Sequence, residues 1–107
     1  MDIGTIRERV KAGNYFVKSH AVQHAIKEGF DRAHMVEAIL NGAIIEEYPD
    51  NDRALICGRI SLVERQAVYL HIVCEYIDPE YVDFVTAYLP DETWETPPFR
   101  RRRAKRD

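Results

Sequence analysis

Hydrophobic residues recur at helical spacing in the first 41 residues and at strand spacing in much of the remainder. Thr5 and Glu8 have capping-box spacing at the start of the first apolar stretch. Asp31 begins the clearest stretch as its N-cap, and Gly42 ends it. The pattern predicts three short helices, at 5–12, 20–28 and 32–41.

After Gly42, β-branched and aromatic residues form four runs separated by turn residues. These runs predict strands at 43–48, 53–60, 67–77 and 81–89. Consecutive strands favour an antiparallel meander, and helices followed by strands are typical of an α+β fold. We therefore expect the N-terminal helices to pack on one face of a four-stranded antiparallel sheet and the other face to be more open.

The alternation of the last two strands predicts their register. A turn centred on residues 79–80 makes one face wholly apolar by pairing Leu70 with Leu89, Ile72 with Ala87 and Cys74 with Val85. The opposite face then carries four polar or aromatic neighbours, namely Tyr69, His71, Thr86 and Tyr88.

His71 is the candidate centre of chemistry on that face. An imidazole flanked by Tyr69 and Tyr88 places a proton-transfer group beside phenolic donors, which suits general acid/base catalysis near neutral pH. The alternative is a structural strand histidine that is hydrogen-bonded to a carboxylate such as Glu75 or to a backbone group. The sequence leaves both interpretations open.

A second pair of histidines, His20 and His24, lies four residues apart on the predicted helix 20–28. Both share a side with Lys27, whereas the apolar side carries Ala21, Val22, Ala25 and Ile26. A zinc site needs a third ligand, and the H-E-x-x-H pattern is absent, so we expect no metal. His20 begins the helix, where an anion can bind, and Lys27 could assist; a plain solvent face is the alternative.

Charged residues are distributed unevenly along the chain. Residues 1–99, the predicted single α+β domain, hold 9 Lys and Arg against 17 Asp and Glu, a net charge of −8. Residues 100–107 form a basic C-terminal tail with 6 basic residues and 1 acidic residue, a net charge of +5. Contact with nucleic acid would therefore depend on the tail or on a local patch, the alternative being a solvated tail.

Other features indicate an ordinary cytoplasmic domain. No apolar run reaches the roughly 20 residues that span a bilayer, and the N-terminus is not signal-like. We expect no cofactor, and we interpret Cys57 and Cys74 as reduced core thiols.

Trp94 and Phe99 are interpreted as a latch that lays the C-terminus over the core. The helix pair 20–41 could be mistaken for a DNA-binding helix-turn-helix, but its second helix carries little positive charge.

Several segments together resemble the domain-of-unknown-function family numbered 4258. They are "SHA" from Ser19, "AIIEEYPDNDRALICG" from Ala43, "LHIVCEY" from Leu70, "VTAYLPDETW" from Val85 and the terminal arginines. The similarity covers about residues 15–101. The family pattern has a charged residue in the helix after His-Ala, where this sequence has His24 and Ala25, so the resemblance gives His24 no role.

The family is similar to toxin ribonucleases of the RelE and BrnT type. This resemblance implies a RelE-like sheet, RNA as the substrate, a cognate antitoxin as the partner and metal-independent cleavage. Candidate catalytic residues are His71, Tyr88 and His20, and candidate substrate-binding residues are Lys27, Arg100, Arg101, Thr86 and Tyr69. Two alternatives stay open: a non-catalytic protein-interaction module and, less favoured, a DNA-binding helix pair. The oligomeric state cannot be predicted.

Overall fold

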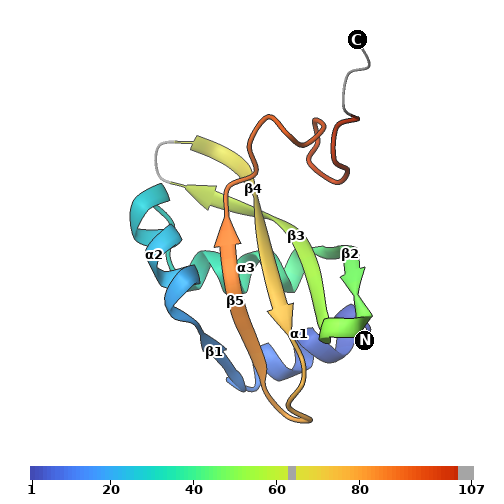
Figure 1. Ribbon diagram of the computed structural model, residues 1–107. Coiled ribbons are helices and arrows are strands. Elements are labelled where there is room, and N and C mark those ends of the chain that lie inside the picture. The colour runs from blue at the N-terminus through green and yellow to red at the C-terminus, as the bar shows by residue number, and fades with distance from the viewer. Residues whose placement is uncertain (63–64, 104–107) are drawn as a thin grey trace.

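The computed structural model describes residues 1–62 and 65–103, and it describes the backbone alone for residues 65–67. Its helices are α1 (Ile3–Lys11), α2 (Ser19–Glu28) and α3 (Arg32–Asn41). Its strands are β1 (Tyr15–Val17), β2 (Ala43–Tyr48), β3 (Arg53–Leu62), β4 (Arg65–Glu75) and β5 (Val82–Tyr88) (Figure 1). The α+β class is confirmed. Within the described ranges, no helix has the length and apolar character needed to cross a membrane.

The helix starts depend on two aspartates. Asp2 caps α1 by accepting a hydrogen bond from the backbone N–H of Thr5 at 2.8 Å, so the predicted capping box at Thr5 is wrong and the helix begins earlier. Asp31 caps α3 as predicted, and accepts from the N–H of His34 at 3.1 Å. In turn, Nδ1 of the His34 ring accepts a hydrogen bond from the backbone N–H of Asp31 at 3.0 Å.

The sheet has five strands in the order β1-β5-β4-β3-β2, with β1 parallel to β5 and the remaining neighbours antiparallel. The predicted meander of β2 to β5 is confirmed, but the prediction of a purely antiparallel four-stranded sheet is wrong. The added strand is only three residues long, which is too short for an alternating pattern to reveal.

The register between β4 and β5 is partly as predicted. His71 lies opposite Tyr88 and Ile72 lies opposite Ala87. An irregularity between Val73 and Cys74 then shifts the pairing by one residue, so that Phe84, not Val85, lies opposite Cys74. The shift buries the larger Phe84 ring completely, where it stacks on Tyr15 at 5.0 Å between ring centroids.

The helices cover one face of the sheet, and the main core lies between them (Figure 1). Gly58 on β3 permits close approach of α3, because a Cβ there would lie 2.0 Å from the carbonyl oxygen of Ala38. α2 packs through Ala21 and Ala25. The predicted apolar side of α2 is therefore partly wrong, since Val22 and Ile26 are exposed.

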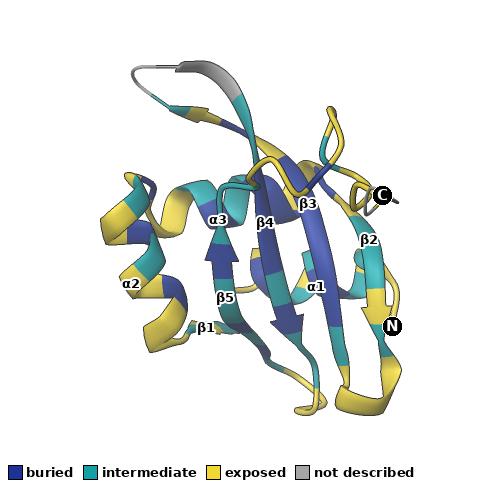
Figure 2. Cartoon of the chain, turned by 45° about the horizontal axis from the view of Figure 1, so that its top comes forward, coloured by how far each residue is buried: buried dark blue, intermediate teal, exposed yellow. Residues whose placement is uncertain are grey.

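Residues 90–103 cross the upper part of the other face, and we call them the C-terminal strap (Figure 2). Trp94 in the strap is buried, and its ring lies 4.4 Å from that of His71 between centroids. The predicted latch is confirmed for Trp94 but not fully for Phe99, which stays exposed, and the expectation of an open face is wrong where the strap lies. The strap includes the first four residues of the predicted basic tail, and residues 104–107 of that tail lie outside the described part of the chain.

Candidate functional site

His71 lies under the strap and is fully buried. Its Nε2 is 2.8 Å from the carbonyl oxygen of Pro98, and its Nδ1 is 3.3 Å from the hydroxyl of Tyr88. Because a carbonyl only accepts, Nε2 carries the proton and donates it to Pro98. In the neutral ring Nδ1 is then an acceptor, so the Tyr88 hydroxyl donates to it. His71 and Tyr88 are thus in contact, as predicted. The alternative prediction, a structural histidine that is hydrogen-bonded to a backbone group, also describes His71, because its ring donates to the Pro98 carbonyl.

Burial governs the protonation of this pair. It lowers the pKa of His71, although the Pro98 carbonyl and the charge of Glu46 act in the opposite direction. Burial also raises the pKa of Tyr88 to about 12. Both side chains are therefore neutral near pH 7, and the phenolic proton stays on Tyr88.

Arg101 links the strap to β2 through Glu46. Its guanidinium donates to both carboxylate oxygens of Glu46, at 3.0 and 3.2 Å, and lies 4.6 Å from the centroid of the Trp94 ring. Burial alone would raise the pKa of Glu46, but hydrogen bonds from Arg101 and from the Tyr48 hydroxyl outweigh it and lower that pKa. Arg101 is thus engaged within the chain.

A pocket of about 370 Å³ opens where α2 meets the end of β5, and we call it the edge pocket. β1 pairs with β5 only as far as Phe84, so the end of β5 is not covered by that strand. The end of α2 lies there instead. The edge pocket is lined by His24, Lys27, Glu28, Tyr88, Leu89 and Asp91.

His24 is held in this pocket by a carboxylate. Its Nδ1 lies 3.1 Å from one oxygen of Glu28, and the other oxygen of Glu28 accepts the backbone N–H of Leu89 at 3.1 Å. The backbone of β5 therefore fixes the carboxylate, and the carboxylate fixes the ring. No hydrogen bond to Nε2 occurs within the described ranges. An imidazole oriented by a carboxylate at one nitrogen and free at the other is suited to act as a general base.

The other predicted site residues lie apart from one another. His20 is exposed on α2 and does not line the edge pocket, whereas Lys27 does. Tyr69 and Thr86 are half-buried on the face that carries His71, and Arg100 is exposed on the strap. His24, to which the sequence interpretation gave no role, lines the edge pocket. The spacing of Ala21 and Ala25, the small residues through which α2 packs, turns His24 toward β5 and His20 to solvent.

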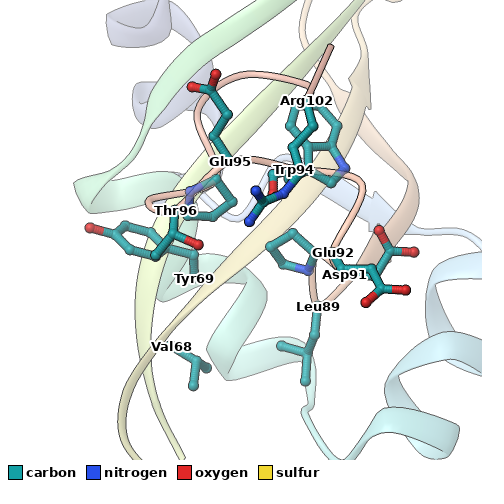
Figure 3. A pocket seen from close by; sticks show the side chains of 11 residues that line it. Val68, Tyr69, Leu89, Asp91, Glu92, Trp94, Glu95, Thr96 and Arg102 are labelled. Carbon is teal, nitrogen blue, oxygen red and sulfur yellow. The ribbon is translucent and has the colours of Figure 1, made fainter. Parts of the chain in front are cut away.

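A second pocket, of about 430 Å³, lies between the strap and the end of β5, and we call it the strap pocket (Figure 3). Tyr69, Leu89, Pro90 and Pro98 form much of its wall. Arg102 donates through Nε to the carbonyl oxygen of Trp94 at 2.7 Å, and the guanidinium points into the pocket (Figure 3).

Two further observations concern metal-ligating side chains and cysteine thiols in the part of the chain that the structure describes. There, no three His, Cys, Asp or Glu side chains are grouped so that they could hold a metal ion. Cys57 and Cys74 are free and buried, and burial raises the pKa of both thiols, that of Cys57 to about 12. Both cysteines are therefore protonated near neutral pH, as the sequence indicates.

Comparison with known proteins yields a family and nothing beyond it. No curated protein and no solved structure matches the chain. A family model described as Domain of unknown function (DUF4258) matches residues 17–89, from the end of β1 to the residue before the strap. The match spans more than half of the sequence, and the chain therefore belongs to this family.

Proposed function

We propose that the protein is a metal-independent endoribonuclease of the toxin type, and that the edge pocket is its cleavage site. The observation that supports this proposal is that the His24–Glu28 pair, Lys27 and Tyr88 all line one pocket. Together they supply a base, a cation and a proton donor, which is what cleavage of RNA through its own 2′-hydroxyl requires.

The proposed reaction begins at His24. Its Nε2 removes the proton from a ribose 2′-hydroxyl, and the 2′-oxygen attacks the adjacent phosphorus. Lys27 stabilises the negative charge that accumulates on the phosphate. The bond from phosphorus to the 5′-oxygen breaks, and Tyr88 donates its proton to that oxygen. The products are a 2′,3′-cyclic phosphate and a 5′-hydroxyl, and solvent returns the proton from His24 to Tyr88.

His71 is a positioning residue in this scheme, because it is buried and touches the pocket only through Tyr88. As a neutral acceptor it holds the Tyr88 hydroxyl in the resting protein, and the scheme requires the O–H bond to turn from Nδ1 of His71 to the leaving oxygen for the proton transfer. Burial raises the pKa of Tyr88 to about 12, so its hydroxyl keeps the proton near neutral pH until the transfer. The acid role assigned to Tyr88 and the choice of His24 over His20 are both parts of the proposal.

Further support comes from charge and from resemblance. The body of the chain is acidic, but Arg100, Arg102 and Arg103 lie in the strap on the same face as Tyr88 and would give RNA a local basic surface. The resemblance to RelE- and BrnT-type toxins, with helices ahead of an antiparallel meander, favours the same activity. By that resemblance the partner would be a cognate antitoxin protein.

The test is RNA cleavage with a chelator present throughout. The substrate is a pool of single-stranded RNA of random sequence. The wild-type protein should cut it, and His24→Gln should be slower by about 10²- to 10⁴-fold, the usual contribution of a general base. His20→Gln is the matched control, since it changes an exposed histidine on the same helix, and should retain wild-type activity. A folded wild-type protein that leaves the pool intact, or equal rates for the two variants, would refute the proposal.

A second candidate function, a non-catalytic protein-interaction module, has one specific observation in its favour. An apolar groove of about 250 Å³ lies beside α2, and the exposed side chains of Val22 and Ile26 line it. Such a groove fits an apolar segment of a partner protein. Absence of cleavage by the folded wild-type protein, together with a defined complex that Ile26→Glu abolishes, would favour this function over the nuclease.

A further inference from the structure

The strap pocket adjoins the edge pocket. Leu89 and Asp91 line both of them, one residue to each side of Pro90. A ligand chain that fills the edge pocket therefore has a second cavity directly beside it. If the edge pocket holds the scissile phosphate of an RNA strand, the strap pocket is placed to receive a neighbouring nucleotide.

Arg102 is the basic residue among those that line the strap pocket, which also include Asp91, Glu92 and Glu95. The hydrogen bond from its Nε to the Trp94 carbonyl fixes the side chain, and the backbone N–H of Arg102 donates to the carbonyl of Thr93 at 2.8 Å. Among the described residues, no carboxylate lies within ion-pairing distance of the Arg102 guanidinium. The carboxylates of Glu92 and Glu95 lie at the rim and point away from its centre (Figure 3). Arg102 thus differs from Arg101, whose charge Glu46 neutralises.

Flat and apolar groups form the rest of the wall. The Tyr69 ring packs edge-to-face with Phe99, at 5.3 Å between centroids, and the guanidinium of Arg59 lies over the ring at 6.0 Å from its centroid. Pro90 and Pro98 add rigid apolar surface. A pocket that combines an aromatic ring with one unneutralised guanidinium fits a ligand with a planar ring and a phosphate, which is the chemistry of a nucleotide.

We propose that the strap pocket binds the nucleotide adjacent to the cleavage site in single-stranded RNA, with its base against Tyr69 and its phosphate on Arg102. This inference rests on the proposed nuclease function. It makes single-stranded RNA the substrate class, because a base held in a duplex cannot turn into the pocket. It also assigns the strap a part in substrate binding as well as in covering His71.

The test uses a hexanucleotide of 2′-O-methyl RNA, which lacks the 2′-hydroxyl nucleophile and so reports binding without cleavage. Trp94 is the only tryptophan of the chain and lines the strap pocket, so its fluorescence follows binding directly. Arg102→Gln should weaken binding about tenfold and should lower the slope of log affinity against log salt by about 0.7, the loss of one phosphate contact on a single strand. Arg32→Gln is the matched control: it removes the same charge from an exposed position on α3, outside the pocket and the strap, and its affinity should stay within about twofold of wild type.

Tyr69→Leu separates stacking from charge. It should weaken hexamer binding about tenfold and leave the salt slope unchanged, because stacking and not a phosphate contact is lost. Equal affinities for Arg102→Gln and Arg32→Gln, or an unchanged affinity for Tyr69→Leu, would overturn the inference even if the protein cuts RNA. Hexamer binding that depends on Arg102 and Tyr69 in a protein that never cuts RNA would support this pocket and refute the proposed nuclease.

Discussion

Trp94→Ala should release the C-terminal strap while the rest of the domain stays folded. Trp94 is 3% exposed and packs against His71 and Arg101. Truncating a buried aromatic residue to alanine costs about 3–5 kcal/mol. The polar attachments that remain are weaker: the hydrogen bond to Pro98 contributes about 1 kcal/mol, and the ion pair of Arg101 with Glu46 less than about 1 kcal/mol because Arg101 is largely exposed. They cannot hold the strap once the Trp94 contact is lost.

Limited trypsin digestion measures this release, because four consecutive arginines, residues 100–103, end the strap. If cleavage follows the population of the released strap, a loss of 3–5 kcal/mol accelerates it by about 10²- to 10³-fold or more. Phe99→Ala is the control, since Phe99 is 43% exposed, and it should accelerate cleavage less than about tenfold. Unchanged protection in Trp94→Ala, or loss of the far-ultraviolet dichroism of the whole domain, would contradict this account of the strap.

Three further predictions concern stability and the edge pocket. Gly58→Ala should lower the free energy of unfolding in urea by about 3 kcal/mol, because its Cβ would meet the backbone carbonyl of Ala38. Gly4→Ala should cost less, because its Cβ would meet only the movable Asp2 side chain, at 3.1 Å; equal effects of the two would contradict the close approach of α3. Because the pKa of His71 is lower in the folded chain than in the unfolded chain, the unfolded chain binds a proton at a pH where folded His71 stays neutral. The free energy of unfolding therefore has its full value above about pH 6.5, the ordinary pKa of histidine, and falls as the pH drops below it. His71→Asn should make that fall shallower by up to about 1.4 kcal/mol per pH unit, and identical slopes would exclude the burial effect. Glu28→Gln should reduce RNA cleavage about tenfold because it loosens His24, and unchanged cleavage would show that the pair is not needed.

Much of the fold could be predicted because local signals agree with the tertiary structure. The helix at 32–41 begins and ends as Asp31 and Gly42 indicate, and the meander follows from four runs with clear strand character. β1 could not be predicted because its three residues form a strand only through parallel pairing with the distant β5. The register shift at Phe84 likewise depends on a nonlocal contact, the stacking of Phe84 on Tyr15.

The candidate site could be predicted only in part. Alternation along β4 and β5 brings His71 to Tyr88, as the structure confirms. The coverage of His71 by the strap is nonlocal, and only the latch interpretation of Trp94 pointed to it. The choice between His20 and His24 depends on how α2 is rotated against β5, and helical spacing alone places both histidines on one side. Ala21 and Ala25 set that rotation, since the helix approaches the sheet through its smallest side chains.

The central claim, that the edge pocket cleaves RNA through the 2′-hydroxyl, is tested most directly with a 2′-O-methyl RNA strand that carries a single unmodified ribonucleotide. The strand is incubated with the protein in the presence of a chelator, and mass spectrometry identifies the ends. The wild-type protein and His20→Gln should cut only on the 3′ side of that ribonucleotide and leave a 2′,3′-cyclic phosphate and a 5′-hydroxyl, whereas His24→Gln should cut at least about a hundredfold more slowly. An intact strand after incubation with the folded wild-type protein, or cuts at methylated positions, would contradict the claim.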